Sequence, residues 1–129
     1  MLTNDARTDA ELALESLYKA RRYLKAAKSW GIADVLGGQS AITALKQMEI
    51  QKAKRNLKRA NYNLSNLMDD LKILGIEKEL SADIGAIAVI LDYAFDGVFA
   101  DFLVQTKIKK SIEDVDDAID AVKSIRSRL

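Results

Sequence analysis

The sequence contains no cysteine, no histidine and no proline. Without cysteine it has no disulfide, no zinc–thiolate site and no thiol nucleophile, which favours a cytoplasmic protein. Without histidine it lacks the commonest general base and the commonest transition-metal ligand. Most familiar catalytic arrangements are therefore excluded, and we expect neither a cofactor nor an enzyme. Without proline, nothing in the composition interrupts long helices.

The sequence also lacks a long apolar run free of charge. The segment from Ile84 to Val104 has 21 residues, enough to cross a membrane, but Asp92, Asp96 and Asp101 lie inside it. A central aspartate costs roughly 2.5 to 3.5 kcal/mol on insertion scales. The first 22 residues have no signal-peptide pattern. We therefore interpret the apolar segment as protein core and expect no transmembrane segment.

Helical periodicity dominates what is present, and it predicts one all-α domain over residues 1–129. The first helix carries a seam whose members are alternately four and three residues apart, and five of its seven members are alanine. These seven residues are Ala6, Ala10, Ala13, Leu17, Ala20, Leu24 and Ala27. Because Trp30 and Gly31 follow the seam, we expect the helix to stop near Ser29.

The rest of the chain predicts three more helices. The second spans residues 39–74, because its heptad seam runs without a slip until Gly75 terminates it. A third is predicted over 82–95 with Ser81 as its N-cap, and a fourth over about 98–128. The expected fold is a four-helix bundle in which two helices, 39–74 and 98–128, are long.

A faint internal repeat appears at an offset of 58 residues, where the seam of the second helix falls on that of the last. Only 6 of the 27 positions from Leu45 to Leu71 are identical. Any two heptad helices can be aligned in this way, so a duplicated helical hairpin and two unrelated helices both fit the pattern.

The net charge of +1 hides an uneven distribution, since residues 19–59 carry a balance of +9 and residues 60–129 a balance of −5. We interpret this as pairing within the molecule, with the second and fourth helices as neighbours. At the same offset three basic residues fall on three acidic ones. The pairs are Arg55 with Glu113, Lys58 with Asp116, and Arg59 with Asp117.

The alternative for the basic residues is a nucleic-acid interface. Its candidate residues are Lys52, Lys54, Arg55, Lys58 and Arg59. Because no helix-turn-helix or other groove-reading motif accompanies them, we prefer the interpretation that they pair internally.

Aspartates embedded among aromatic residues form the other candidate site. Asp92 and Asp96 are one helical turn apart and could share a hard cation. Three further acids, Asp34, Glu49 and Asp101, would complete an all-oxygen site for a divalent ion or a metal-dependent enzyme. Metal sites in helical bundles usually add a histidine, which is missing here. We therefore expect these carboxylates to cap helices or pair with cations, and expect no metal.

Two segments resemble the signature segments of a family of small, uncharacterised, all-helical bacterial proteins. They are Trp30 to Gly38, of pattern W-G-x-x-D-x-L-G-G, and Asp96 to Ile108, of pattern D-G-x-x-A-D-x-x-V-Q-x-K-I. The resemblance implies a helical fold and brings no activity or site residues with it. Our functional prediction is a helical binding or scaffolding module. We expect it to associate with itself, or with another helical protein, through an alanine-rich or leucine-rich seam.

Overall fold

The computed structural model describes residues 2–35, 40–100 and 105–129, with side chains described except at 2–4, 30–35, 40–43, 77, 79, 96–100 and 105–106. These residues form four α-helices, as predicted. Their bounds are Leu2–Val35 for α1, Ser40–Leu74 for α2, Glu77–Ala100 for α3 and Gln105–Ser127 for α4.

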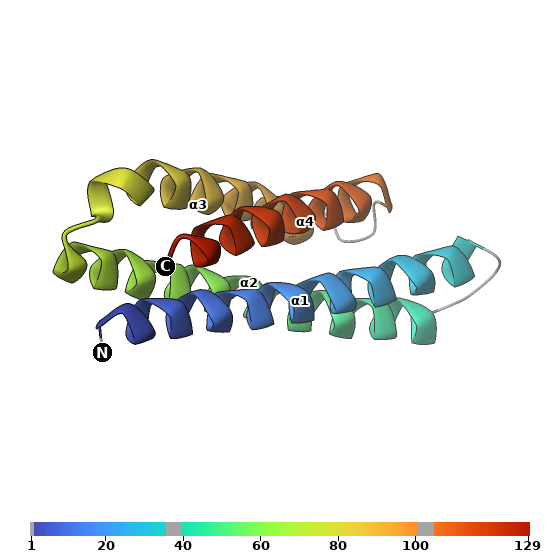
Figure 1. The fold of residues 1–129 in the computed structure, drawn as a ribbon. Coiled ribbons are helices and arrows are strands. Elements are labelled where there is room, and N and C mark those ends of the chain that lie inside the picture. Colours follow the sequence, from blue (N-terminus) through green and yellow to red (C-terminus); the bar gives the residue numbers. More distant parts are fainter. Residues whose placement is uncertain (1, 36–39, 101–104) are drawn as a thin grey trace.

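The helices form an up-down-up-down bundle of two antiparallel hairpins, with both chain ends at the same end of the molecule (Figure 1). Helix α1 packs against α2 and α4, and α3 packs against α4 and α2. At 34 and 35 residues, α1 and α2 are longer than α3 and α4, which have 24 and 23. The first hairpin therefore extends beyond the second (Figure 1).

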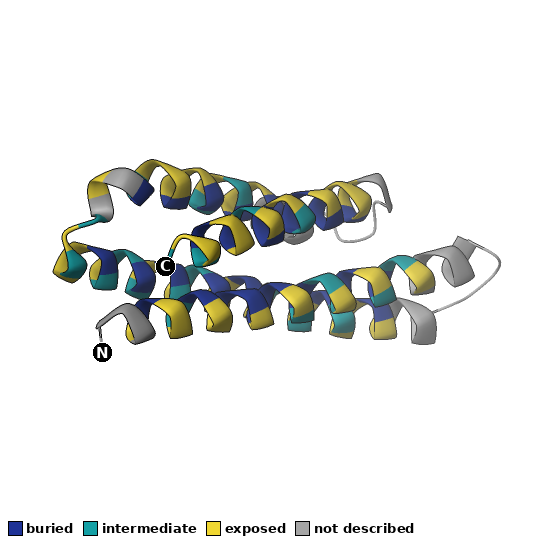
Figure 2. Ribbon diagram, viewed as in Figure 1, coloured by how far each residue is buried: buried dark blue, intermediate teal, exposed yellow. Residues whose placement is uncertain are grey.

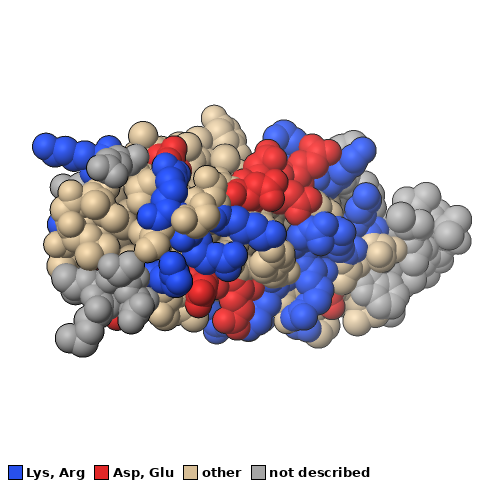
Figure 3. Space-filling model, in the orientation of Figure 1, with Lys and Arg blue, Asp and Glu red and all other residues tan. Residues whose placement is uncertain are grey.

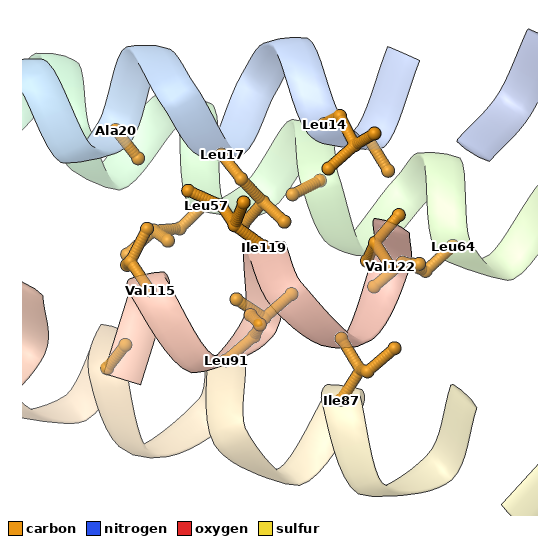
Figure 4. Packing of buried hydrophobic residues seen from close by; sticks show 14 of the residues in the cluster. Leu14, Leu17, Ala20, Leu57, Leu64, Ile87, Leu91, Val115, Ile119 and Val122 are labelled. Carbon is orange, nitrogen blue, oxygen red and sulfur yellow. The ribbon is translucent and has the colours of Figure 1, made fainter. Parts of the chain in front are cut away.

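All four helices contribute apolar side chains to one core. The seven seam residues of the first helix are all fully buried in α1, and the seam of α2 is buried from Ile50 to Leu71. Buried and exposed positions alternate along every helix with helical periodicity (Figure 2). Leu17, Leu57, Leu91 and Val115, one from each helix, belong to this core, and their side chains point towards the interior of the bundle (Figure 4). The predicted seams are thus confirmed as the core.

The join between α2 and α3 is a tight helix terminus. Gly75 has a φ of +77°, a left-handed conformation that glycine adopts without strain. Its N–H donates to the Lys72 carbonyl at 3.1 Å, and the Ile76 N–H donates to the Leu71 carbonyl at 3.1 Å. This pair of bonds is a Schellman motif, and it satisfies two carbonyls at the end of α2.

Several helix ends differ from the sequence prediction. Helix α1 continues through Trp30 and Gly31, because one glycine costs only about 1 kcal/mol in a long helix that contains no proline. Helix α3 begins at Glu77, not at Ala82, since the Schellman turn leads directly into a new helix. It also continues through Gly97 to Ala100, so α4 begins at Gln105 and not near residue 98.

The expectation that α2 and α4 are neighbours is wrong. Over the described residues no Cα atom of α2 lies within 8 Å of a Cα atom of α4, because the two helices are diagonal in the bundle. The end of α1 and the start of α2, at Val35 and Ser40, precede the end of α3 and the start of α4, at Ala100 and Gln105, by 65 residues. This differs by one heptad from the offset of 58 at which the seams align, and a seven-residue repeat does not fix a register by itself. The internal duplication stays a prediction.

Candidate functional site

The acidic candidates do not assemble into a site over the described residues. Glu49 is half-buried on α2, whereas Asp92 is exposed on α3. Asp34 and Asp96 lie within α1 and α3, but their side chains fall outside the described residues, as does all of Asp101. Among the side chains that are described, no three acids lie close enough together to hold a metal ion.

The basic candidates lie together on α2, where we name them the basic surface. It consists of Lys52, Lys54, Arg55, Lys58 and Arg59 of α2, with Lys19 of α1 beside them. Burial, and then the nearby charge of Lys58, lower the pKa of the Lys54 ammonium group. In the described part of the chain, no carboxylate lies within ion-pair distance of Arg55, Lys58 or Arg59.

Two acids of α4 form ion pairs and neither pairs with α2, which corrects the internal pairing expected from the sequence. Asp116 accepts a hydrogen bond from Nε of Arg21 on α1 at 2.5 Å. Asp114 accepts one from Lys110 of its own helix at 2.8 Å. Figure 3 shows a face of the molecule on which basic and acidic side chains are interspersed. In the described part of the chain, Asp116 and Asp114 thus have their charge partners on α1 and within α4, and no ion pair joins α4 to Arg55, Lys58 or Arg59.

A second surface was missed by the sequence analysis, and we name it the outer face of α3. Ala82, Ala86, Val89 and Tyr93 are all exposed, with 53% of Val89 and 69% of Tyr93 accessible to solvent. Their spacing of four, three and four residues repeats on the outside of α3 the pattern that its buried residues follow on the inside. This second seam is readable in the sequence once the inner seam has been assigned.

A shallow groove between α2 and α3 adjoins the outer face. It has a volume of about 260 Å³, and every residue that lines it is uncharged. The lining residues are Asn61, Leu64, Ser65, Met68, Ile84, Gly85 and Ala88. An uncharged groove beside an exposed apolar ridge is the surface that another helix packs against.

Three charged side chains border the outer face over the described residues. Asp83 accepts a hydrogen bond at 2.6 Å from Arg128, which follows the end of α4. Lys78 and Asp92 are exposed near opposite ends of the face and form no ion pair within the described chain. The face therefore carries one free positive charge and one free negative charge, with an apolar stretch between them.

Over the described residues, none of the helices combines the length and the apolar composition that a bilayer crossing requires. No family model, no curated protein and no solved structure matches the chain. The resemblance of its two signature segments to the bacterial family stays a prediction.

Proposed function

We propose that this protein is a self-associating helical module, in which two copies join through the outer face of α3. The predicted alanine-rich and leucine-rich seams cannot serve this purpose, because they are buried within a single chain. The outer face of α3 is free, apolar and shaped like a helix seam. The two α3 helices would pack antiparallel about a two-fold axis near Gly85.

Gly85 is the observation that carries the proposal. A glycine inside an exposed helix destabilises it by about 1 kcal/mol relative to alanine. A Cβ atom placed on Gly85 would meet nothing within 4 Å, so no contact of the described chain requires a glycine there. The missing side chain leaves the backbone of α3 open to close approach by a helix from outside.

The charges that border the face favour a second copy as the partner. Lys78 and Asp92 are separated by fourteen residues, or about 21 Å along the helix, and Gly85 lies midway between them. In an antiparallel pair that crosses at Gly85, each Lys78 falls opposite the Asp92 of the other copy. Each Val89 then lies near Ala82 of the other copy, so that large side chains meet small ones.

The size of the proposed α3 interface determines how tightly we expect two copies to associate. One helix face with its adjoining groove is smaller than a standard protein interface, so we expect a reversible dimer with a dissociation constant in roughly the micromolar range. Such an equilibrium suits a scaffolding module whose assembly depends on concentration.

The test is sedimentation equilibrium on the wild-type protein and on Gly85→Leu. Leucine is a better helix former than glycine, so the variant should melt at a higher temperature as a monomer. The same side chain would block the crossing and weaken association at least about tenfold, or about 1.4 kcal/mol. Opposite effects on stability and association separate loss of an interface from damage to the fold.

Val89→Arg is the second variant, and Ile73→Arg is its control. Ile73 is another exposed apolar side chain, 63% accessible on α2, and lies outside the proposed interface. Only the change at Val89 should abolish the dimer. A wild-type protein that stays monomeric at about 500 µM, or variants that associate as the wild type does, would overturn the proposal.

A further inference from the structure

Three shallow depressions adjoin the basic surface of α2. Arg55 lies where these depressions meet, with volumes of about 540, 270 and 180 Å³. Lys52 borders the first two, and Gln51 borders the first and third. Among the described residues that line the three depressions, none is acidic. An extended ligand lying along α2 would therefore meet only basic, polar and apolar groups.

Arg55, Lys58 and Arg59 lie close together on this surface, and none of the described carboxylates is within ion-pair distance of them. Burial is the largest cause of the lowered pKa of Lys54, and the nearby charge of Lys58 is the second. Lys19 does have a partner, Glu15, at 3.0 Å, but both side chains are substantially exposed. A polyanion that binds here relieves the repulsion between the cations and releases its own counterions, and both effects favour binding.

Aromatic side chains accompany the cations. The ring of Tyr23 has Arg22 at 5.3 Å and Lys52 at 5.5 Å from its centroid, and these contacts hold Lys52 at the α1–α2 junction. Tyr62 follows Arg55 and Arg59 at a spacing of four and three residues, so the three lie on one side of α2. Tyr62 is 67% exposed.

We propose that the basic surface binds single-stranded nucleic acid, with phosphates on Arg55 and Arg59 and a base stacked on Tyr62. Proteins that bind single-stranded nucleic acid combine a row of cations with exposed aromatic rings, because every base has a π-face that can stack on such a ring. A free phosphate would gain nothing from Tyr62. This proposal stands independently of the α3 dimer, which uses a different surface.

Fluorescence anisotropy with a labelled oligo-uridine or oligo-thymidine of about 20 nucleotides tests the proposal. If Lys52, Arg55, Lys58 and Arg59 each neutralise one phosphate, the logarithm of the binding constant should fall with the logarithm of salt concentration with a slope of about −3. Arg55→Glu with Arg59→Glu should weaken binding more than about tenfold and flatten that slope.

Matched control variants distinguish the loss of a specific binding site from the effect of a changed net charge. Lys107→Glu with Lys109→Glu makes the same change in charge at exposed positions of α4 and should leave binding within about twofold. Tyr62→Ala should weaken binding about fivefold or more, whereas Tyr62→Phe, which keeps the ring, should not. Gly85→Leu should bind as the wild type does, which distinguishes this site from the dimer interface.

Binding to vesicles that contain anionic lipid is measured in parallel, because a membrane surface is the alternative ligand for the basic surface. Weaker binding to vesicles than to the oligonucleotide at equal salt supports the proposal. Tighter binding to vesicles would overturn it in favour of a membrane surface. Equal loss of oligonucleotide binding in the α4 control, or no binding at low salt, would overturn it as well.

Discussion

Asp9 on α1 and Asp70 on α2 lie beside each other at the interface between the two helices, where Oδ2 of Asp70 is buried without a hydrogen-bond partner among the described residues. Burial, followed by the hydrogen bond with Asp70 and the negative charges of Asp70 and Asp5, raises the pKa of Asp9 from 3.8 to about 7. A protonated Asp9 donates the hydrogen bond that the two carboxyl groups share.

This pair predicts a pH dependence of stability with a definite sign. The folded protein holds the Asp9 proton up to about pH 7, whereas the unfolded chain releases it near its ordinary pKa of 3.8. The contribution to stability is therefore fully present below about pH 4 and is lost as the pH rises towards 7.

Asp70→Asn removes the repulsion between the two ionised carboxylates. We expect this variant to be more stable than the wild type at about pH 8, by an amount on the order of 1 kcal/mol because solvent screens a partly exposed pair. The gain should vanish at about pH 5, where Asp9 is protonated. Urea melts across this range measure it, with Asp69→Asn as the exposed neighbouring control. Parallel pH profiles for all three proteins would refute the coupling.

Two glycines should respond in opposite directions to the same substitution. Gly75→Ala places a Cβ at a φ of +77° and should destabilise the protein by roughly 1 to 2 kcal/mol. Gly85→Ala should stabilise the monomer by about 1 kcal/mol, because it is helical and its Cβ meets open space. Melts at a concentration low enough to keep the protein monomeric compare the two. An equal effect would contradict the assigned backbone geometry.

The partner of Asp116 is Arg21, and charge reversal tests that assignment. Arg21→Glu should cost roughly 0.5 to 1 kcal/mol, and Asp116→Arg should restore most of it in the double variant. Lys58→Glu should not be rescued by Asp116→Lys, since α2 and α4 lie diagonally. A coupling energy larger for Lys58 than for Arg21 would restore the pairing inferred from the sequence.

Core packing, in contrast with these charges, sets most of the stability. Leu57 is 1% exposed and Val115 is fully buried, so Leu57→Ala should cost about 2 to 4 kcal/mol and Val115→Ala somewhat less. Lys58→Glu, one position along on the exposed side of α2, should change stability by less than about 0.5 kcal/mol. Chemical denaturation gives the loss in the free energy of unfolding for each of the three variants. A loss for Lys58→Glu as large as that for Leu57→Ala would contradict the assigned core.

The core was predictable because heptad spacing depends only on which residues are apolar. Every seam residue from Ala6 to Ala27 is buried as that spacing requires. Helix ends were harder to predict, because Gly31 and Gly97 resemble terminators but lie within helices, whereas Gly75 does terminate one. Single glycines cost too little to decide the outcome alone.

The neighbours of each helix were not predictable from one seam. A heptad repeat aligns equally well when shifted by seven residues, and it does not say which two of four helices are diagonal. The charge match between Lys58 and Asp116 therefore looked persuasive in the sequence although the bundle separates their helices. The outer face of α3 was missed because its apolar residues were all assigned to the core.

The central claim, that two copies join through α3, is tested most directly by mixing two charge variants. Lys78→Glu alone faces the partner's Asp92 with like charge, and Asp92→Lys alone faces the partner's Lys78 in the same way. Each variant should therefore associate more weakly than the wild type. In a mixture of the two, every facing pair is again opposite in sign, so sedimentation velocity should show a heterodimer at wild-type strength. If the mixture sediments only as the two separate variants do, the antiparallel α3 dimer is contradicted.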